Sequence, residues 1–256
     1  MGMVFAVVNQ KGGVGKTTTT INLAACIASL GKRVLAIDID PQGNCTTGIG
    51  IEKNGDCVYD CIINDAEPKN VIRPTEYENM DILPSGISLA GAEVELVNKP
   101  KREFLLQSIV NKVKNDYDYI FFDCQPSLGL LTINALTASD GVIVPIQCEF
   151  FALEGLSQLV TTIKMIRGSL NPRLYIEGVI LTMYDSRTNL STQVADEVSR
   201  HFGDTLYKAY IPRNVRLGEA PSFAKAIIDY DARSAGAIKY MELAKEFIDR
   251  REKDGN

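Results

Sequence analysis

The segment from Asn9 to Thr18 (N-Q-K-G-G-V-G-K-T-T) has the composition of a loop that binds phosphate groups. Its three glycines allow the backbone to approach an anion closely, because no Cβ atom stands in the way. Successive backbone N–H groups and the positive end of a following helix would face the phosphate oxygens. In such a loop the lysine contacts the β- and γ-phosphates and the next hydroxyl binds Mg²⁺. The segment predicts a nucleoside triphosphate site made by Lys11, Gly12, Gly13, Val14, Gly15, Lys16, Thr17 and Thr18.

The spacing departs from both common nucleotide-loop patterns. The pattern GxxxxGK[ST] requires glycine at position 10, where the chain has Gln10, and a lysine, Lys11, follows it. The dinucleotide pattern GxGxxG/A fails because Thr18 stands where it requires Gly or Ala. The context of a strand before the loop and a helix after it still favours a triphosphate over a plain glycine-rich turn.

Three aspartates follow apolar runs of strand length. Asp38 and Asp40 come at the end of the run Arg33–Ile37, and Asp123 ends the run Tyr119–Phe122. The carboxyl ends of parallel strands form the edge at which open sheets bind ligands, so we expect these carboxylates near the phosphates. Asp123 has the usual context of a carboxylate that holds Mg²⁺ through water. The alternative for Asp38 and Asp40 is that each caps the turn that follows it.

The elements that would position these residues alternate along the chain. Continuous apolar strands separated by helices imply parallel strands buried on both faces. The sequence therefore predicts an α/β protein with one domain, residues 1–250, built on a mostly parallel twisted sheet flanked by helices on both faces. The predicted strands are Val4–Val8, Arg33–Ile37, Met80–Leu83, Tyr119–Phe122, Gly141–Ile146, Leu174–Leu181 and Leu206–Ile211. The predicted helices are Lys16–Leu30, Glu103–Lys114, Leu153–Arg167, Leu190–Phe202 and Ala235–Arg250.

Two segments lack a clear period. Residues Ile51–Asn79 are polar and are expected to form short helices between the second and third strands. Residues 251–256 are expected to form a short, disordered polar tail.

Composition narrows the class of protein. The chain has 256 residues, 45% of them hydrophobic, and a formal net charge of −5, which argues against a globally basic coat for nucleic acid. No stretch approaches the roughly 18 apolar residues of a transmembrane helix, and the first residues lack the basic region of a signal peptide. The six cysteines form no CxxC pair and there is one histidine, so we expect reduced thiols, no zinc site and a cytoplasmic protein.

The phosphate loop and the segment Val34–Asn44 (V-L-A-I-D-I-D-P-Q-G-N) together resemble the deviant Walker ATPases of the ParA/MinD family, and most of all its chromosomal Soj-type members. The resemblance continues through four further segments and so covers nearly the whole chain. It implies an ATPase with slow intrinsic turnover that uses ATP and Mg²⁺. The family usually has proline where this chain has Gln125, which leaves the stiffness of that loop open. The further segments are Phe122–Leu128, Glu149–Gly155, Leu181–Asp185 and Ile211–Leu217.

The resemblance also implies roles for single residues. Lys11 would reach across a homodimer interface to the phosphates of the partner's ATP, where a second cation stabilises charge as an arginine finger does. Asp40 would orient the attacking water, and Lys16 would act with Lys11 in catalysis. The magnesium residues would be Thr17, Asp38 and Asp123. The base would lie near Met183, Pro212 and Asn214.

The resemblance is compatible with several cellular functions for the ATPase. The preferred one is chromosome or plasmid partitioning, in which an ATP-bound dimer binds double-stranded DNA without sequence preference and a ParB-type centromere-binding partner stimulates its release. Such a protein would be associated with the nucleoid. The candidate DNA-binding residues are Arg187, Arg213, Arg216, Lys225 and Arg233, although interspersed acidic residues also fit an ordinary solvated surface.

Three alternatives remain. A MinD-like protein would dock its last helix on a membrane, but Glu242, Glu246 and Asp249 would be repelled by anionic lipid, so no stable membrane association is expected. A nitrogenase-reductase type needs cysteines arranged for an iron–sulfur cluster, and Cys124 beside Asp123 has no such partners in the sequence pattern. A non-hydrolytic adaptor would use ATP only as a structural ligand, and Asp40 argues against it.

Overall fold

A seven-stranded sheet forms the centre of the computed structural model, which describes residues 2–149 and 152–254. In that part of the chain the strand order is β3-β4-β2-β5-β1-β6-β7, and every neighbouring pair is parallel except β3 and β4. The expected mostly parallel α/β fold is confirmed. The strands are β1 (Met3–Val7), β2 (Val34–Asp38), β3 (Arg73–Pro74), β4 (Met80–Leu83), β5 (Tyr119–Asp123), β6 (Gly141–Gln147) and β7 (Tyr175–Thr182).

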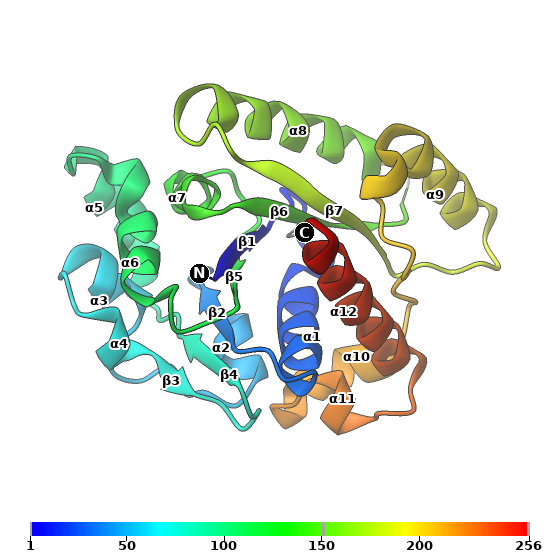
Figure 1. Cartoon of the computed structure of the whole chain (residues 1–256), viewed down its shortest axis with the longest axis horizontal. Helices are drawn as coiled ribbons and strands as arrows, with labels where there is room; N and C mark the ends of the chain where they lie inside the picture. The colour runs from blue at the N-terminus through cyan, green and yellow to red at the C-terminus, as the bar shows by residue number, and fades with distance from the viewer. Residues whose placement is uncertain (1, 150–151, 255–256) are drawn as a thin grey trace.

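Helices cover both faces of the sheet (Figure 1). One face carries α1 (Lys16–Ser29), α2 (Asn44–Gly48), α10 (Val215–Glu219), α11 (Ile227–Tyr230) and α12 (Ala235–Asp254). The other carries α3 (Val58–Ile63), α4 (Pro68–Val71), α5 (Leu89–Glu95), α6 (Leu105–Val113), α7 (Leu130–Ala138), α8 (Ala152–Ser169) and α9 (Asn189–Phe202). Short 3₁₀ turns lie at Leu96–Asn98, Arg102–Phe104, Gly203–Thr205 and Ala220–Phe223.

The central strands are mostly apolar because both faces of the sheet are buried. In β1, Val4 and Ala6 pack into one core, whereas Phe5 and Val7 pack into the core on the opposite face. Removal of these side chains from water contributes roughly 25 cal/mol per Å² of apolar surface. Two buried layers therefore hold the strand ends, and the side chains just beyond them, in fixed positions.

The last helix supports the helix that follows the phosphate loop. Helix α12 packs along α1 on one face of the sheet, and Phe247 of α12 lies edge-on against Phe5 at a ring distance of 5.0 Å. Near the loop itself, the hydroxyl groups of Thr19 and Tyr240 lie 3.2 Å apart. The start of α1 is thus fixed by the C-terminal part of the chain.

Two expectations about local structure are wrong. The segment Leu206–Ile211 is not a strand of the sheet. It contacts β7 through an isolated bridge at Leu206 and through single hydrogen bonds from the Tyr207 and Ile211 N–H groups. The backbone N–H groups of Lys208 and Ala209 donate to the carboxylate of Glu246 in α12 instead of to a strand. Residues 251–254 are not a disordered tail but the last turn of α12. There Arg251 forms a 3.0 Å ion pair with the buried Glu177 of β7.

The polar stretch Ile51–Asn79 forms α3, α4 and the two-residue strand β3, which agrees with the expectation of short helices. Helices α5 and α7 were not anticipated. Helix α7 has an almost uniformly apolar sequence (L-L-T-I-N-A-L-T-A), so no helical period distinguishes it from a buried strand.

Candidate nucleotide-binding site

The phosphate loop joins β1 to α1 in a conformation that needs glycine at two positions. Gly13 and Gly15 have φ values of 76° and 88°, in the left-handed region, and Gly15 is the N-cap residue directly before α1. The loop is tied to the neighbouring strands at two points. The Asn9 amide donates to the Pro145 carbonyl at 2.8 Å, and the Thr182 hydroxyl donates to the Val14 carbonyl at 2.8 Å. The curved loop is therefore held in place by β6 and β7.

Lys16 is buried at the first position of α1, with 7% of its surface exposed. Its ammonium group donates to the Lys11 carbonyl at 3.0 Å, inside the curve of the loop. Burial lowers the pKa of Lys16, and the carboxylates of Asp123 and Asp40 act in the opposite direction. A buried ammonium group enclosed by a loop of backbone N–H groups is an arrangement that binds phosphate.

Asp38 and Asp123 lie opposite each other at the ends of neighbouring strands β2 and β5, and both are fully buried. Burial raises the pKa of Asp38 to about 6, although its Oδ2 accepts hydrogen bonds from the amide and the hydroxyl of Thr46. Burial and then the nearby Asp38 raise the pKa of Asp123 well above its usual value. Two buried carboxylates side by side need a cation to be ionised together.

The residues present fit a magnesium ion. The Thr17 hydroxyl donates to Asp123 Oδ2 at 2.8 Å, and Thr20 donates to Asp123 Oδ1 at 3.2 Å. These are hard oxygen donors, and magnesium needs few protein ligands because it keeps waters and binds substrate phosphates. Across residues 2–149 and 152–254, no cluster of three or more His, Cys, Asp or Glu side chains forms a metal site. Asp123 accepts a hydrogen bond from the Thr17 hydroxyl, whereas Asp38 accepts one from Thr46. Asp123 is therefore the carboxylate in direct contact with the phosphate loop.

Asp40 lies just beyond β2, with 8% of its surface exposed. Its backbone N–H donates to Asp38 Oδ1 at 3.1 Å, and its carboxylate accepts the Gln42 N–H at 2.9 Å. The Ser85 hydroxyl donates to the Asp40 carbonyl at 2.7 Å and so ties this turn to the end of β4. The turn-capping role considered for both aspartates is thus observed, and for Asp40 it occupies one carboxylate oxygen. The second oxygen, Oδ2, is where a water-positioning role would act.

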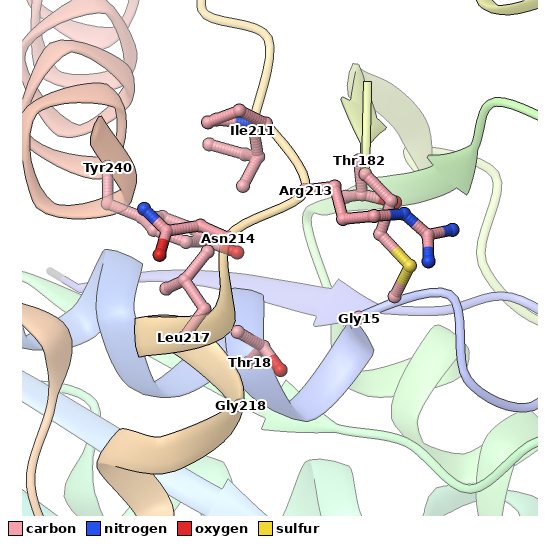
Figure 2. A pocket seen from close by; sticks show the side chains of 11 residues that line it. Gly15, Thr18, Thr182, Ile211, Arg213, Asn214, Leu217, Gly218 and Tyr240 are labelled. Atoms are coloured by element: carbon pink, nitrogen blue, oxygen red, sulfur yellow. The ribbon is translucent and has the colours of Figure 1, made fainter. Parts of the chain in front are cut away.

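A cavity of about 180 Å³ opens beside the phosphate loop, and Figure 2 shows it. Gly15 and Thr18 form its loop side, and Tyr240 of α12 closes another side. The three residues expected near the base all line it, because the bridge between Tyr184 and Pro212 brings the two segments that carry them together. Those residues are Met183, Pro212 and Asn214.

Two further side chains in this region have defined positions. The Asn214 side chain accepts the Arg216 N–H at 2.8 Å and so caps α10. Arg213, expected to contact DNA, lines the cavity beside the loop. A cation at this place can also contact a bound nucleotide.

The second loop lysine, Lys11, is held within its own chain. Its Nζ lies 2.5 Å from Oε2 of Glu149, and the Gln147 amide contacts Oε1 of the same carboxylate. Glu149 received no role from the sequence, although it follows the carboxyl end of β6 and so lies at the same sheet edge as the aspartates. Thr20, Thr46 and Ser85 were missed as well, and their hydroxyl groups carry no sequence signal of their own.

The candidate DNA-binding residues are exposed, but two of them are ion-paired. Arg187, in the connection from β7 to α9, forms two hydrogen bonds with Asp185. Arg216 of α10 lies 2.9 Å from Glu219 and 3.6 Å from Asp231. Such surface pairs are weak and can be exchanged for phosphate groups. The exposed residues are Arg187, Arg213, Arg216, Lys225 and Arg233.

The chain is similar to known proteins over nearly its whole length. The sequence model of a family described as an AAA domain matches residues 2–176. The chain is 59% identical over 248 residues to the sporulation initiation inhibitor protein Soj of Bacillus subtilis, covering 96% of this chain and 98% of that protein. It is 51% identical over 251 residues to the chromosome partitioning protein ParA of Caulobacter vibrioides, covering 96% and 94%.

Solved structures share the fold. A cobyrinic acid a,c-diamide synthase from Mycobacterium smegmatis, with bound ATP analog and magnesium, superposes with a TM-score of 0.87 at 37% identity, over 100% of this chain and 98% of that one. The cell division ATPase MinD of Pyrococcus furiosus gives 0.81 at 24% identity, over 98% and 99%. Fold and site thus define a P-loop ATPase. The chain belongs to the ParA/MinD family of these enzymes and is similar to its Soj-type members, as the sequence motifs indicated.

Proposed function

We propose that this protein is a partitioning ATPase that binds ATP and Mg²⁺, dimerises around the bound nucleotide and then binds double-stranded DNA without sequence preference. The observation that carries the proposal is the meeting of two lysines, three aspartates and a cavity of about 180 Å³ around one glycine-rich loop. The names of the Soj and ParA relatives favour chromosome partitioning as the output. Because the M. smegmatis relative is named for a different reaction, the fold alone does not define the output.

Within this proposal each group has a distinct task. The loop amides and Lys16 bind the phosphates, while the hydroxyl of Thr17 and the carboxylate of Asp123 hold magnesium, directly or through water. The metal supplies charge neutralisation at the β- and γ-phosphates. Asp40 orients a water molecule for attack, and Lys11 leaves Glu149 to reach the partner's nucleotide. Asp38 supports the site from the next strand through Thr46 and the Asp40 N–H.

Hydrolysis then provides the release step. A dimer that contains ATP in its interface is stabilised by ATP and weakened once the γ-phosphate leaves. Turnover is slow on its own, and a ParB-type partner accelerates it by completing the site around the nucleotide. The protein would accordingly be cytoplasmic and associated with the nucleoid while ATP is bound.

The membrane alternative has less support. In the described residues, no helix has both the length and the apolar character that crossing a membrane requires. Helix α12, the candidate for surface docking, buries Tyr240, Leu243 and Phe247 in the core next to α1. Docking on lipid would require these side chains to leave the core.

Cosedimentation with random-sequence duplex DNA and with anionic liposomes, each with and without ATP and Mg²⁺, tests the proposal. We expect ATP-dependent pelleting with DNA and none with liposomes. ATP-dependent pelleting with liposomes alone would favour the MinD-like function instead.

A further inference from the structure

The carboxylate of Glu93 in α5 contacts both ends of the loop that follows β5. At the start of this loop, the Gln125 side-chain amide donates to Glu93 Oε1 at 2.9 Å. At the other end, a Cβ atom at Gly129 would collide with the same carboxylate. Gly129 is the N-cap residue directly before α7, and negative charge is favourable near a helix N-terminus. Glu93 therefore joins α5 to the loop from residue 124 to residue 129.

This loop directly follows Asp123, the carboxylate proposed to hold magnesium. Asp123, which accepts hydrogen bonds from Thr17 and Thr20, is separated from Gln125 by a single residue. The far half of the loop is fixed on α7, because the Thr132 hydroxyl donates to the Ser127 carbonyl at 2.7 Å. The position of the near half depends on what holds Gln125.

Pro126 disfavours the helical region for Gln125 but does not fix its φ. A proline at position 125 would fix φ near −65° without any partner. With Gln125, a hydrogen bond to a neighbouring element can supply this further restriction. Glu93 provides it, and a hydrogen bond to a charged acceptor is stronger than one between neutral groups.

We propose that Glu93 is a positioning residue for ATP hydrolysis, which holds Gln125 and thereby orients the loop behind Asp123. The role in ATP hydrolysis rests on the proposed function. The role of Glu93 in ordering the loop does not depend on that function. Loss of the contact is expected to slow the chemical step and leave ATP binding unchanged, since neither residue belongs to the phosphate loop.

A charge-swap experiment on the full chain tests this proposal. Gln125→Glu places two carboxylates together, and we expect single-turnover ATP hydrolysis to slow about tenfold, the equivalent of one lost charged hydrogen bond, with an unchanged Kd for ATP and Mg²⁺. Adding Glu93→Gln to this variant restores a donor and an acceptor at the same two positions, so the rate should return. Gly129→Ala, which displaces the Glu93 carboxylate without altering either partner, should slow the reaction like Gln125→Glu.

The matched control is Glu95→Gln on the same helix. Its carboxylate accepts a hydrogen bond from Tyr59 and is exposed, away from the loop. This variant should keep the wild-type rate. A Gln125→Pro variant, in which the ring replaces the contact, should make Glu93→Ala harmless.

Hydrogen exchange supplies a readout that needs no hydrolysis. Amides from 124 to 130 should exchange faster in Gln125→Glu than in the wild type, while those of α1 keep their protection, and the double variant should restore the slow exchange. Equal exchange in all three proteins, or a double variant as slow in hydrolysis as the single one, would overturn the inference. A wild-type protein that hydrolyses no ATP would refute the proposed function, and the exchange pattern would still decide the role of Glu93.

Discussion

Lys11 and Glu149 form an ion pair inside one chain, with 2.5 Å between Nζ and Oε2. About 40% of each side chain is exposed, so solvent weakens the pair and it is worth at most about 1 kcal/mol. The same lysine is the one proposed to reach the nucleotide of a partner subunit. Opening of this pair is therefore a step that dimerisation has to include.

The first prediction concerns that step. Glu149→Ala should release Lys11 and lower the protein concentration at which the ATP-bound dimer forms by up to about thirtyfold, because the symmetric dimer opens two weak pairs of at most about 1 kcal/mol each. Light scattering or sedimentation with a non-hydrolysable analogue measures it. Glu52→Ala is the control for loss of a remote acidic residue, and a weaker dimer in Glu149→Ala would contradict the prediction.

Lys16→Ala should abolish nucleotide binding, because the buried ammonium is the cation inside the phosphate loop. Titration with ATP and Mg²⁺ by calorimetry checks this. Lys32→Ala, which removes a lysine that pairs with Glu252 at the surface, should bind normally. Normal turnover in Lys16→Ala would remove the assignment of the loop.

Asp40→Ala should bind ATP and form the dimer but hydrolyse ATP slower by about 10²-fold or more, the usual effect of a misplaced reacting group. The measurement is single-turnover hydrolysis beside a dimerisation assay. Rapid hydrolysis by this variant would refute the water-positioning role. Because the carboxylate also accepts the Gln42 N–H, Asp40→Asn is the control that keeps the turn intact.

Arg216→Ala should weaken binding to random-sequence DNA and reduce the slope of log K against log salt by about 1 for each protomer, as expected for one lost phosphate contact. Glu219→Gln should act in the opposite direction, because it frees Arg216 from its 2.9 Å partner. Arg173→Ala, an exposed arginine just before β7, is the control. An unchanged salt dependence in Arg216→Ala would show that this residue does not face DNA.

The buried pair of Glu177 and Arg251 gives a pH-dependent prediction. Arg251→Ala should lower the free energy of unfolding by about 3 kcal/mol near neutral pH, because the fully buried carboxylate loses its cation. Burial already raises the pKa of Glu177, and loss of Arg251 raises it further. Stability of the variant therefore falls as pH rises above the ordinary glutamate pKa, and the deficit shrinks at about pH 4, where the carboxyl is protonated in both states.

Urea unfolding at several pH values measures this effect. Lys253→Ala, on the exposed side of the same helix, should stay within about 0.5 kcal/mol of the wild type. A deficit that is equal at every pH would assign the loss to packing of Arg251 on Tyr175 instead of to its charge.

The phosphate site could be predicted from sequence because its chemistry lies in a contiguous segment. Gly13 and Gly15 require a conformation that other residues avoid, and the loop directly follows an apolar strand. The aspartates were placed correctly for a related reason, since Asp38 and Asp123 end apolar runs and the carboxyl ends of parallel strands share one edge.

Contacts between distant segments could not be predicted in the same way. The extended segment Leu206–Ile211 has the pattern of a strand, but Glu246 in α12 takes two of its N–H groups, and no local signal announces that competition. Arg251 was assigned to a tail because its neighbours are polar, whereas its partner Glu177 lies far away in the sequence. Glu149 was overlooked because a carboxylate beside a lysine becomes visible only after the fold brings them together.

The packing of α12 along α1, with Tyr240 beside Thr19, also bears on how the protein is made. The helix that follows the phosphate loop is synthesised some two hundred residues before the helix that supports it. In a nascent chain whose residues 235–254 are still inside the ribosome, the phosphate loop and α1 are present but α12 cannot yet pack on α1. We expect competence for nucleotide to arise late in translation, so that unfinished chains do not sequester ATP.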